Sequence, residues 1–237
     1  MALGLGTAQN NLVPNPSFET YTTCPSQGSG WPNEINYATP WYNPNTLSPD
    51  YFNSCCTNGT VDVPYNFNGY QTARTGNAYA GIYVWAYNNG SAREYIQAPL
   101  LDTLKANHEY CVSFFVNLPI SAVYHYAITE IGLLFSNNSI IQSNPLYFNY
   151  TPQISSSAGF FLTDTLNWME VTGTYTAVGG EKYITIGNFN TDANTDTLNC
   201  AGINFSAQAY YYVDDVSIVD CTTDIPEINS GKSSNVF

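Results

Sequence analysis

Two short segments near the ends of the chain constrain its fold more than any other feature. Residues 11–19 read Asn-Leu-Val-Pro-Asn-Pro-Ser-Phe-Glu, and residues 210–218 read Tyr-Tyr-Tyr-Val-Asp-Asp-Val-Ser-Ile. An apolar segment ending in Phe-Glu, matched with a final aromatic and β-branched strand, suggests one closed β-sandwich. We expect the first and last strands to lie together around a cation. This pairing indicates a secreted binding module.

Seven segments of the chain read as strands. Aromatic residues make up 15% of the chain and charged residues only 10%, which favours pleated strands over surface helices. The expected strands are residues 78–85, 93–98, 109–118, 130–135, 168–175, 182–189 and 210–219. Segment 109–118 is apolar on both faces, so we expect it in the centre of a sheet. The pattern predicts an all-β, two-sheet antiparallel sandwich.

The chain reads as a single domain over residues 11–221. Residues 20–78 contain many prolines and glycines, which predicts long N-terminal loops with short extended pieces around Trp41-Tyr42 and residues 69–71. Residues 137–166 predict a second long excursion. Residues 1–10 resemble the end of a signal peptide behind a Met. Residues 222–237 read as a flexible linker.

The charge balance excludes several classes of partner. Only five Lys and Arg face 18 Asp and Glu, which gives a net charge of −13. Nucleic acid and anionic membrane surfaces both require a basic protein surface. No apolar run is long enough to span a bilayer, so we expect no membrane insertion. Divalent cations and neutral ligands such as sugars remain compatible with this composition.

The cysteines predict an oxidising compartment. The six are Cys24, Cys55, Cys56, Cys111, Cys200 and Cys221. Their spacing fits no zinc site, and their even number allows up to three disulfides, whose connectivity the sequence leaves open. Cys55 and Cys56 are expected to bond to different partners. A bond from Cys24 to one of them would staple the N-terminal loop. Buried free thiols are the alternative.

The two adjacent aspartates of the last strand are candidate cation ligands. Strand alternation places Asp214 on the face of Val216 and Ile218, and Asp215 on the opposite face. An inward carboxylate at the edge of a sandwich needs a partner, and a cation can supply it. The alternative is that an aspartate caps a loop or pairs with Arg74 or Arg93.

The two end segments, together with Trp168-x-x-Val-x-Gly-x-Tyr, resemble jelly-roll carbohydrate-binding modules. The resemblance is to the galactose-binding-like superfamily that includes families 4, 9, 16 and 22. It implies a jelly-roll fold, a glycan partner and a structural Ca²⁺. By this resemblance, Glu19, Asp214 and Asp215 are the metal ligands, helped by backbone carbonyls. Calcium takes six to eight oxygen ligands, which fits such a site.

Other segments resemble a narrower group of proteins. They are residues 41–44, 49–55, 69–71, 76–81 and 93–97, among them Tyr-Phe-Asn-Ser-Cys and Arg-Glu-Tyr-Ile-Gln. These are similar to cargo domains of large surface proteins in gliding bacteria. The resemblance implies export by a type IX secretion system to the cell surface, with a C-terminal sorting domain expected beyond residue 237.

Sugar binding requires exposed aromatic faces beside hydrogen-bonding amides. Trp85, Tyr87 and Asn88 form the best candidate group, because they combine both features at a strand end. The other candidates are Trp31, Trp41, Tyr42, Tyr124 and Tyr126. For each aromatic residue the alternative is packing in the core or a loop. Trp168, within an alternating strand, is expected in the core.

Catalytic signatures are few. The chain has no Gly-x-Ser-x-Gly, His-Glu-x-x-His or phosphate-loop motif, and its two histidines lack catalytic spacing. Glu94, Glu130 and Glu170 are candidate carboxylates for a glycosidase, although the sequence singles out no pair. Arg93-Glu94 reads better as a structural ion pair. We therefore predict a secreted, non-catalytic surface domain that binds carbohydrate or is adhesive. The alternatives are a protein-interaction domain without sugar selectivity and a β-sandwich glycoside hydrolase.

Overall fold

The computed structural model describes residues 10–27, 34–121, 123–202 and 207–221. Its strands are β1 (Asp50–Asn53), β2 (Tyr65–Asn66), β3 (Gly69–Tyr70), β4 (Ala78–Ala86), β5 (Tyr95–Pro99), β6 (Glu109–Asn117), β7 (Tyr126–Ile128), β8 (Gly132–Ser136), β9 (Ile154–Ser155), β10 (Met169–Thr176), β11 (Tyr183–Gly187), β12 (Thr197–Asn199) and β13 (Gln208–Asp220). Two 3₁₀ turns, η1 (Glu34–Tyr37) and η2 (Asp192–Asn194), are the helical elements of the described residues. None of these helices is long and apolar enough to cross a membrane.

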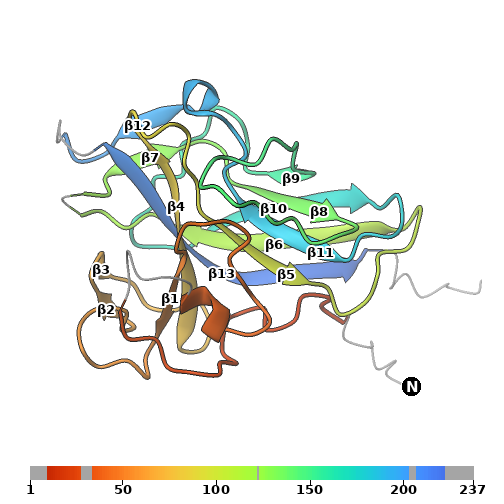
Figure 1. Cartoon of the computed structure of the whole chain (residues 1–237), viewed down its shortest axis with the longest axis horizontal. Helices are drawn as coiled ribbons and strands as arrows, with labels where there is room; N and C mark the ends of the chain where they lie inside the picture. The colour runs from red at the N-terminus through yellow and green to blue at the C-terminus, as the bar shows by residue number, and fades with distance from the viewer. Residues whose placement is uncertain (1–9, 28–33, 122, 203–206, 222–237) are drawn as a thin grey trace, which may run out of the picture.

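Two antiparallel sheets form the sandwich (Figure 1). The larger has the order β1-β4-β13-β6-β10, and the smaller β5-β11-β8-β9. Two short two-stranded pairs, β12-β7 and β2-β3, form separate small sheets. The predicted all-β jelly-roll sandwich with long N-terminal loops is confirmed. All seven expected strands are present, and β6 is central, between β13 and β10.

The core lies between the two sheets because alternate side chains of each point inward. From the larger sheet, Val112, Phe114 and Val116 of β6 enter the core cluster. From the smaller sheet, Ile184 and Ile186 of β11 enter the same cluster. These inward side chains are buried, and together they make one continuous apolar layer.

The outer face of the larger sheet carries a second, aromatic cluster. Phe52, Tyr79, Tyr210 and Tyr212 are buried there under residues of the 56–73 loops. The rings of Tyr79 and Tyr212 lie 4.7 Å apart, and those of Phe52 and Tyr79 lie 5.1 Å apart. Gly81 permits this packing, because a Cβ on it would lie 2.0 Å from the Tyr210 hydroxyl. The long N-terminal loops thus cover the part of the outer sheet face that carries this aromatic cluster.

A bulge in β13 overturns the expected facing of the two aspartates. Asp214 is opposite Phe115, and Ile218 is opposite Val112, with a register shift between Asp214 and Ser217. Asp215 has a positive φ of 48° at this shift. Since the bulge adds one residue, Asp214 lies on the outer face, whereas Val216 and Ile218 point into the core.

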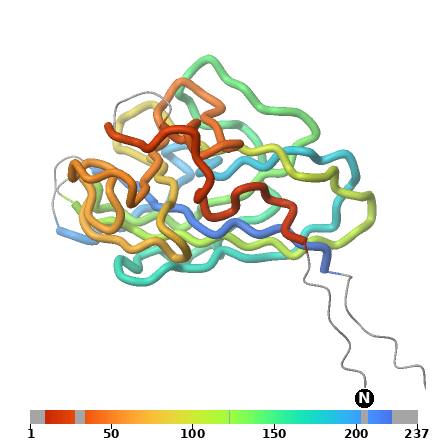
Figure 2. Tube along the Cα trace, turned by 90° about the horizontal axis from the view of Figure 1, so that it is seen from below, coloured from red at the N-terminus to blue at the C-terminus, as the bar shows by residue number. Residues whose placement is uncertain are grey.

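The first and last segments lie side by side, as expected. The amide of Leu12 donates to the carbonyl of Ile218 (2.8 Å), and the amide of Val216 donates to the carbonyl of Pro16 (3.0 Å). Figure 2 shows residues 10–20, in red, following the blue strand β13. The expected leader residues 1–9 and the linker 222–237 lie outside the described residues.

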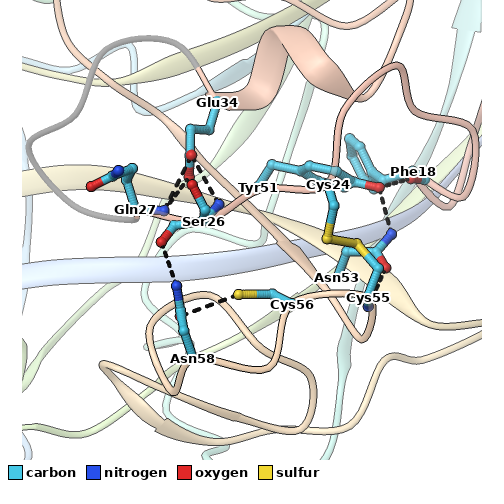
Figure 3. Close-up of a disulfide and its surroundings, with 10 residues drawn as sticks. All are labelled: Phe18, Cys24, Ser26, Gln27, Glu34, Tyr51, Asn53, Cys55, Cys56 and Asn58. Carbon is cyan, nitrogen blue, oxygen red and sulfur yellow. Dashed lines mark hydrogen bonds between the residues drawn. A yellow bond between two sulfur atoms is a disulfide. The ribbon is translucent and has the colours of Figure 1, made fainter.

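Two disulfides hold the long loops and the C-terminal strand. Cys24–Cys55 staples the N-terminal loop to the end of β1, and the neighbouring Cys56 points away from this bond (Figure 3). Cys111–Cys221 joins β6 to the end of β13. The prediction that all six cysteines are disulfide candidates is therefore wrong for two, since Cys56 is a buried free thiol and Cys200 an exposed one.

Candidate functional site

A pocket of about 400 Å³ opens on the outer face of the larger sheet, beside the aromatic cluster. We call it the tyrosine pocket. Its walls come from the start of β1, from β4 and the turn after it, from the residue before β5, and from β13. It is lined by Leu47, Ser48, Asp50, Tyr83, Ala86, Tyr87, Asn88, Asn89, Glu94, Tyr124, Gln208 and Tyr210.

Two buried carboxyl groups line this pocket. Asp50 is 2% exposed, and its Oδ2 accepts a 2.6 Å hydrogen bond from the hydroxyl of Tyr210. Glu94 is 7% exposed, and its two oxygens accept from the backbone amides of Ser48 (3.1 Å) and Tyr83 (2.8 Å). The pocket thus holds two acids whose hydrogen-bond donors are all neutral.

Burial makes both acids weaker than usual. Loss of solvent raises the pKa of Glu94 to about 7, although the two backbone amides oppose this change. Burial also raises the pKa of Asp50 well above its ordinary value, and the nearby charge of Glu94 adds to the effect. Such shifts in a pocket are typical of functional sites.

Tyrosine rings form the walls of the pocket. The rings of Tyr124 and Tyr210 lie 5.0 Å apart, and those of Tyr83 and Tyr124 lie 6.5 Å apart with their planes almost perpendicular. The amide of Asn89 donates to the hydroxyl of Tyr83 (2.9 Å). Burial raises the pKa of Tyr83 to about 12, so its hydroxyl stays protonated at neutral pH. The walls therefore present neutral aromatic faces and hydroxyl groups.

The turn after β4 provides the rim. Tyr87 is 69% exposed, and its backbone amide is fixed by the carbonyl of Ala207 (3.0 Å). Asn88 has a positive φ of 56°, which asparagine tolerates better than most residues. Among the ligand residues predicted from the sequence, the pocket brings together Tyr87, Asn88 and Tyr124.

The other predicted ligand residues lie elsewhere. Trp85 is only 6% exposed and packs on Tyr126 with ring centres 5.4 Å apart, so no sugar ring can stack on it. Trp41 is also buried, with its indole donating to the carbonyl of Asn15. Tyr42 bonds the hydroxyl of Ser139 outside the pocket. Trp31 lies outside the described residues.

Trp168 also differs from expectation. Its indole donates to the carbonyl of Thr72 (3.1 Å), and its ring meets the edge of Tyr79. It therefore packs on the outer aromatic cluster, where the prediction placed it in the core.

A bulge explains the burial of Trp85. In the pairing of β4 with β13, Tyr83 is opposite Tyr210 and Trp85 is opposite Ala209, which leaves Val84 with no residue opposite. Both Val84 and Trp85 consequently belong to the core cluster. Strict alternation would have turned Trp85 outward.

The three predicted metal ligands converge on one loop. Glu19 accepts from the amide of Asn77 (2.8 Å), and Asp214 accepts from the amide of Arg74 (2.8 Å). Asp215 forms an ion pair with the Arg74 guanidinium. Among the described residues, no three His, Cys, Asp or Glu side chains form a metal-binding group.

Asp214 nevertheless suits a cation. Its side chain is fully buried, and this burial, together with the charge of Asp215, raises the pKa of Asp214 to about 8. A hard cation would compensate such a carboxylate, and backbone carbonyls would complete its oxygen ligands. In the structure, Asp214 caps the loop at Arg74 and Asp215 forms an ion pair, and a bound calcium ion stays a prediction.

The three predicted catalytic glutamates line different pockets. Glu94 lines the tyrosine pocket, Glu130 binds the amide of Asn190 in a second hollow, and Glu170 lines a third. The proposed Arg93–Glu94 ion pair is wrong. Arg93 is fully buried and pairs with Asp192, whereas Glu94 accepts hydrogen bonds from the amides of Ser48 and Tyr83.

Sequence reasoning missed Asp50, Tyr83, Gln208 and Tyr210. No local pattern marks them, because they come from three distant strands. Gly81 is the one sequence feature that indicates one of them, Tyr210. A glycine inside an apolar strand indicates close approach of another group, and here that group is Tyr210.

Comparison with known proteins adds no family. No family model and no curated protein matches the chain. Three solved structures have similar folds at low identity. The CBM22-1–GH10 modules of xylanase Xyn10B from Clostridium thermocellum, complexed with xylohexaose, match at 14% identity and a TM-score of 0.37, over 64% of this chain and 23% of that one. This chain thus spans about a quarter of that protein's length.

The other two match over most of their length. The CBM22-1 xylan-binding domain of Paenibacillus barcinonensis Xyn10C has 13% identity and a TM-score of 0.41, covering 90% of this chain and 96% of that one. The K2 cleaved adhesin domain of Lys-gingipain has 13% identity and a TM-score of 0.38, covering 86% and 96%. At these levels of similarity, function rests on the geometry of the tyrosine pocket itself.

Proposed function

We propose that this protein is a non-catalytic, extracellular domain that binds carbohydrate in the tyrosine pocket. The observation that carries the proposal is the composition of that pocket. Tyrosine faces, three side-chain amides and two carboxyl groups line one opening of about 400 Å³. A concave site that combines aromatic faces with several hydrogen-bonding side chains suits a polar small ligand.

The chemistry of a sugar matches this lining. The C–H face of a pyranose packs on an aromatic ring, and Tyr87 offers an exposed ring at the rim. Hydroxyl groups of the sugar need donors and acceptors, which Asn88, Asn89 and Gln208 supply. The volume is sufficient for one or two sugar rings, so we expect recognition of a chain end or a short segment.

A glycan array followed by calorimetry tests the proposal. We expect the wild-type protein to bind at least one glycan class and Tyr87→Ala to weaken that binding about tenfold, through lost stacking. Tyr65→Ala is the matched control, because Tyr65 is 68% exposed and lies outside the pocket. No binding on the array, or equal losses in both variants, would overturn the proposal. It would favour the alternative of a protein-interaction surface without sugar selectivity.

Glycoside hydrolysis is a second candidate, favoured by the pair Asp50 and Glu94. Glycosidases use two carboxyl groups at one site, with the acid held protonated near neutral pH. The raised pKa of Glu94 fits that role. Against it, both oxygens of Glu94 already accept backbone hydrogen bonds. Release of reducing sugar that disappears in Asp50→Asn would support catalysis over binding alone.

Export by a type IX secretion system to the cell surface is a further part of the proposal. The sequence resemblance supports it, and the two disulfides are compatible with an oxidising compartment. Surface labelling of the full-length protein in its own bacterium, with and without a functional secretion system, tests this. Unchanged surface exposure after loss of that system would exclude it.

A further inference from the structure

We propose that the tyrosine pocket selects an amino sugar with a free, protonated amine over neutral sugars of the same linkage. This inference rests on the proposed function and names its ligand class. Two observations carry it: the charge of the residues that line the pocket, and the aromatic faces beside them.

The pocket has an acidic floor with no basic group. Asp50 and Glu94 line it, and no Lys, Arg or His is among its lining residues. The nearest basic side chain in sequence is Arg93, whose guanidinium is fully buried and paired with Asp192. Glu34, which acts on Asp50 through its charge, makes the surroundings more acidic still. The charge of Arg93 also acts on Tyr83, but its pairing with Asp192 offsets part of it, and the lining residues themselves carry only acidic groups.

Both acids keep acceptor capacity. The hydrogen bond from Tyr210 occupies Oδ2 of Asp50, and no described residue donates to Oδ1. Glu94 accepts from the amides of Ser48 and Tyr83 and interacts with the Ser48 hydroxyl, and a carboxylate has about four acceptor sites, so at least one stays open. An ammonium group carries three donors and no acceptor, and Asp50 and Glu94 are close enough for their charges to interact, so it suits this acid pair.

The tyrosine rings add a second attraction for a cation. The ring of Tyr124 lies 6.5 Å from that of Tyr83 and 5.0 Å from that of Tyr210, and all three residues line the pocket. Tyrosine faces attract an ammonium group through the ring quadrupole, most strongly where water is excluded. A neutral sugar would keep the stacking on Tyr87 but leave the acid pair without a counter-charge.

Protonation of the pocket makes the inference measurable. With the pKa of Glu94 near 7 and that of Asp50 raised, the free pocket retains a proton at pH 6. An ammonium group stabilises the ionised carboxylates, so its binding expels that proton. The tyrosine hydroxyls stay protonated, because burial raises the pKa of Tyr83 and Tyr210. Binding of a neutral sugar leaves the proton in place.

Three tetrasaccharides with the same β-1,4 linkage provide the test: glucosamine tetramer, N-acetylglucosamine tetramer and cellotetraose. Calorimetry of the wild-type protein at pH 6, in two buffers with different ionisation enthalpies, gives affinity and proton release together. We expect the glucosamine tetramer to bind about tenfold more tightly than the other two, with release of a proton. Asp50→Asn should lose both the preference and the release. Asp196→Asn, an exposed residue outside the pocket with the same change in net charge, should retain them.

The possible results separate this inference from the proposed function. Equal or tighter binding of the two neutral tetramers overturns the inference and leaves carbohydrate binding intact, whereas no binding of any tetramer or array glycan overturns both. A lysine tetrapeptide or CaCl₂ alone that binds as tightly as the amino sugar, with loss in Asp50→Asn, also overturns it. If Asp50→Asn fails to fold, proton release by the wild-type protein decides, since its absence contradicts the mechanism.

Discussion

The hydroxyl of Tyr210 donates a 2.6 Å hydrogen bond to Oδ2 of Asp50, although 160 residues separate the two in sequence. This bond joins β13 to β1 across the strand β4 that lies between them. It crosses directly over Gly81, the residue without a side chain. The floor of the tyrosine pocket is thereby tied to the edge of the larger sheet.

Tyr210→Phe should destabilise the protein. The variant removes the donor and leaves a buried carboxyl group without it, which costs about 1–2 kcal/mol of unfolding free energy. Urea unfolding measures the change, with the slope expected to stay constant. Tyr65→Phe, at an exposed tyrosine, should change the free energy by less than about 0.5 kcal/mol. Equal effects in the two variants would contradict the role assigned to this bond.

Gly81→Ala should be more damaging than an ordinary surface substitution. The new Cβ would lie 2.0 Å from the Tyr210 hydroxyl and 2.7 Å from the Phe52 ring, so the aromatic cluster must shift. Overpacking of this kind costs about 1–3 kcal/mol. The double variant with Tyr210→Phe removes the closest atom and should be more stable than the sum of the two losses predicts. Strictly additive losses in thermal unfolding would show that the two positions do not interact.

The acid pair should make stability depend on pH. The folded-state pKa of Glu94, about 7, is above its ordinary value of 4.5, so the folded state holds the proton more tightly. This contribution is fully present below about pH 4.5 and is lost as pH rises through 7, amounting to at most about 3 kcal/mol. Asp50→Asn removes the neighbouring acid. Its stability relative to wild type should therefore increase between pH 4.5 and 7.5, as followed by urea unfolding. A constant difference across this range would refute the coupling.

Calcium is expected to stabilise the fold through Glu19, Asp214 and Asp215. A ligand that binds only the folded state raises the unfolding midpoint, so EDTA should lower the Tm by several degrees and CaCl₂ should restore it. Asp214→Asn should abolish this response, whereas Asp196→Asn should preserve it. An identical Tm with and without EDTA would leave the Arg74 ion pair and the loop cap as the whole role of these carboxylates.

Thiol labelling should distinguish the two unpaired cysteines. Cys200 is exposed and should react with iodoacetamide in the native protein, although burial of its sulfur raises the pKa and slows the reaction. Cys56 is buried and should react only after unfolding. Mass spectrometry should then find two labelled cysteines without reductant and six with it. A third disulfide involving Cys56 would contradict the structure.

The main strands were predictable from the sequence because strands buried in a sandwich are rich in β-branched and aromatic residues. Strands β4, β6, β10 and β13 are long and rich in β-branched and aromatic residues. Short strands carry much less information. β1 has four residues and includes Asp50 and Asn53, so nothing in its composition distinguishes it from a loop. β7 and β12 have three residues each, and both were missed.

The candidate site was harder to predict, since two bulges redirect side chains without changing composition. One residue inserted at Val84 turns Trp85 inward, and one at Asp215 turns Asp214 outward. Strict alternation of inward and outward side chains fails at both bulges for one physical reason. An inserted residue inverts the facing of the residues on one side of the bulge relative to those on the other. Tyr87 and Asn88 were found because they lie in a turn, where exposure follows from the turn itself, and Tyr124 because it lies beside a loop, although a β-bridge to Gln208 holds it. To predict Asp50 as a residue of the pocket would have required the order of the strands in the larger sheet.

The bond between Cys111 and Cys221 has a mechanical consequence. It links the end of β13 covalently to β6, the central strand of the larger sheet. Tension applied at residue 221 therefore passes directly into β6, and the 110 residues spanned by the bond bear no load. In a single-molecule pulling experiment, this would shorten the extended chain by about 370 Å until the disulfide is reduced. Gln208 and Tyr210 of the tyrosine pocket lie within the segment that the bond relieves of load, whereas Asp50 and Glu94 lie before Cys111, on the loaded side.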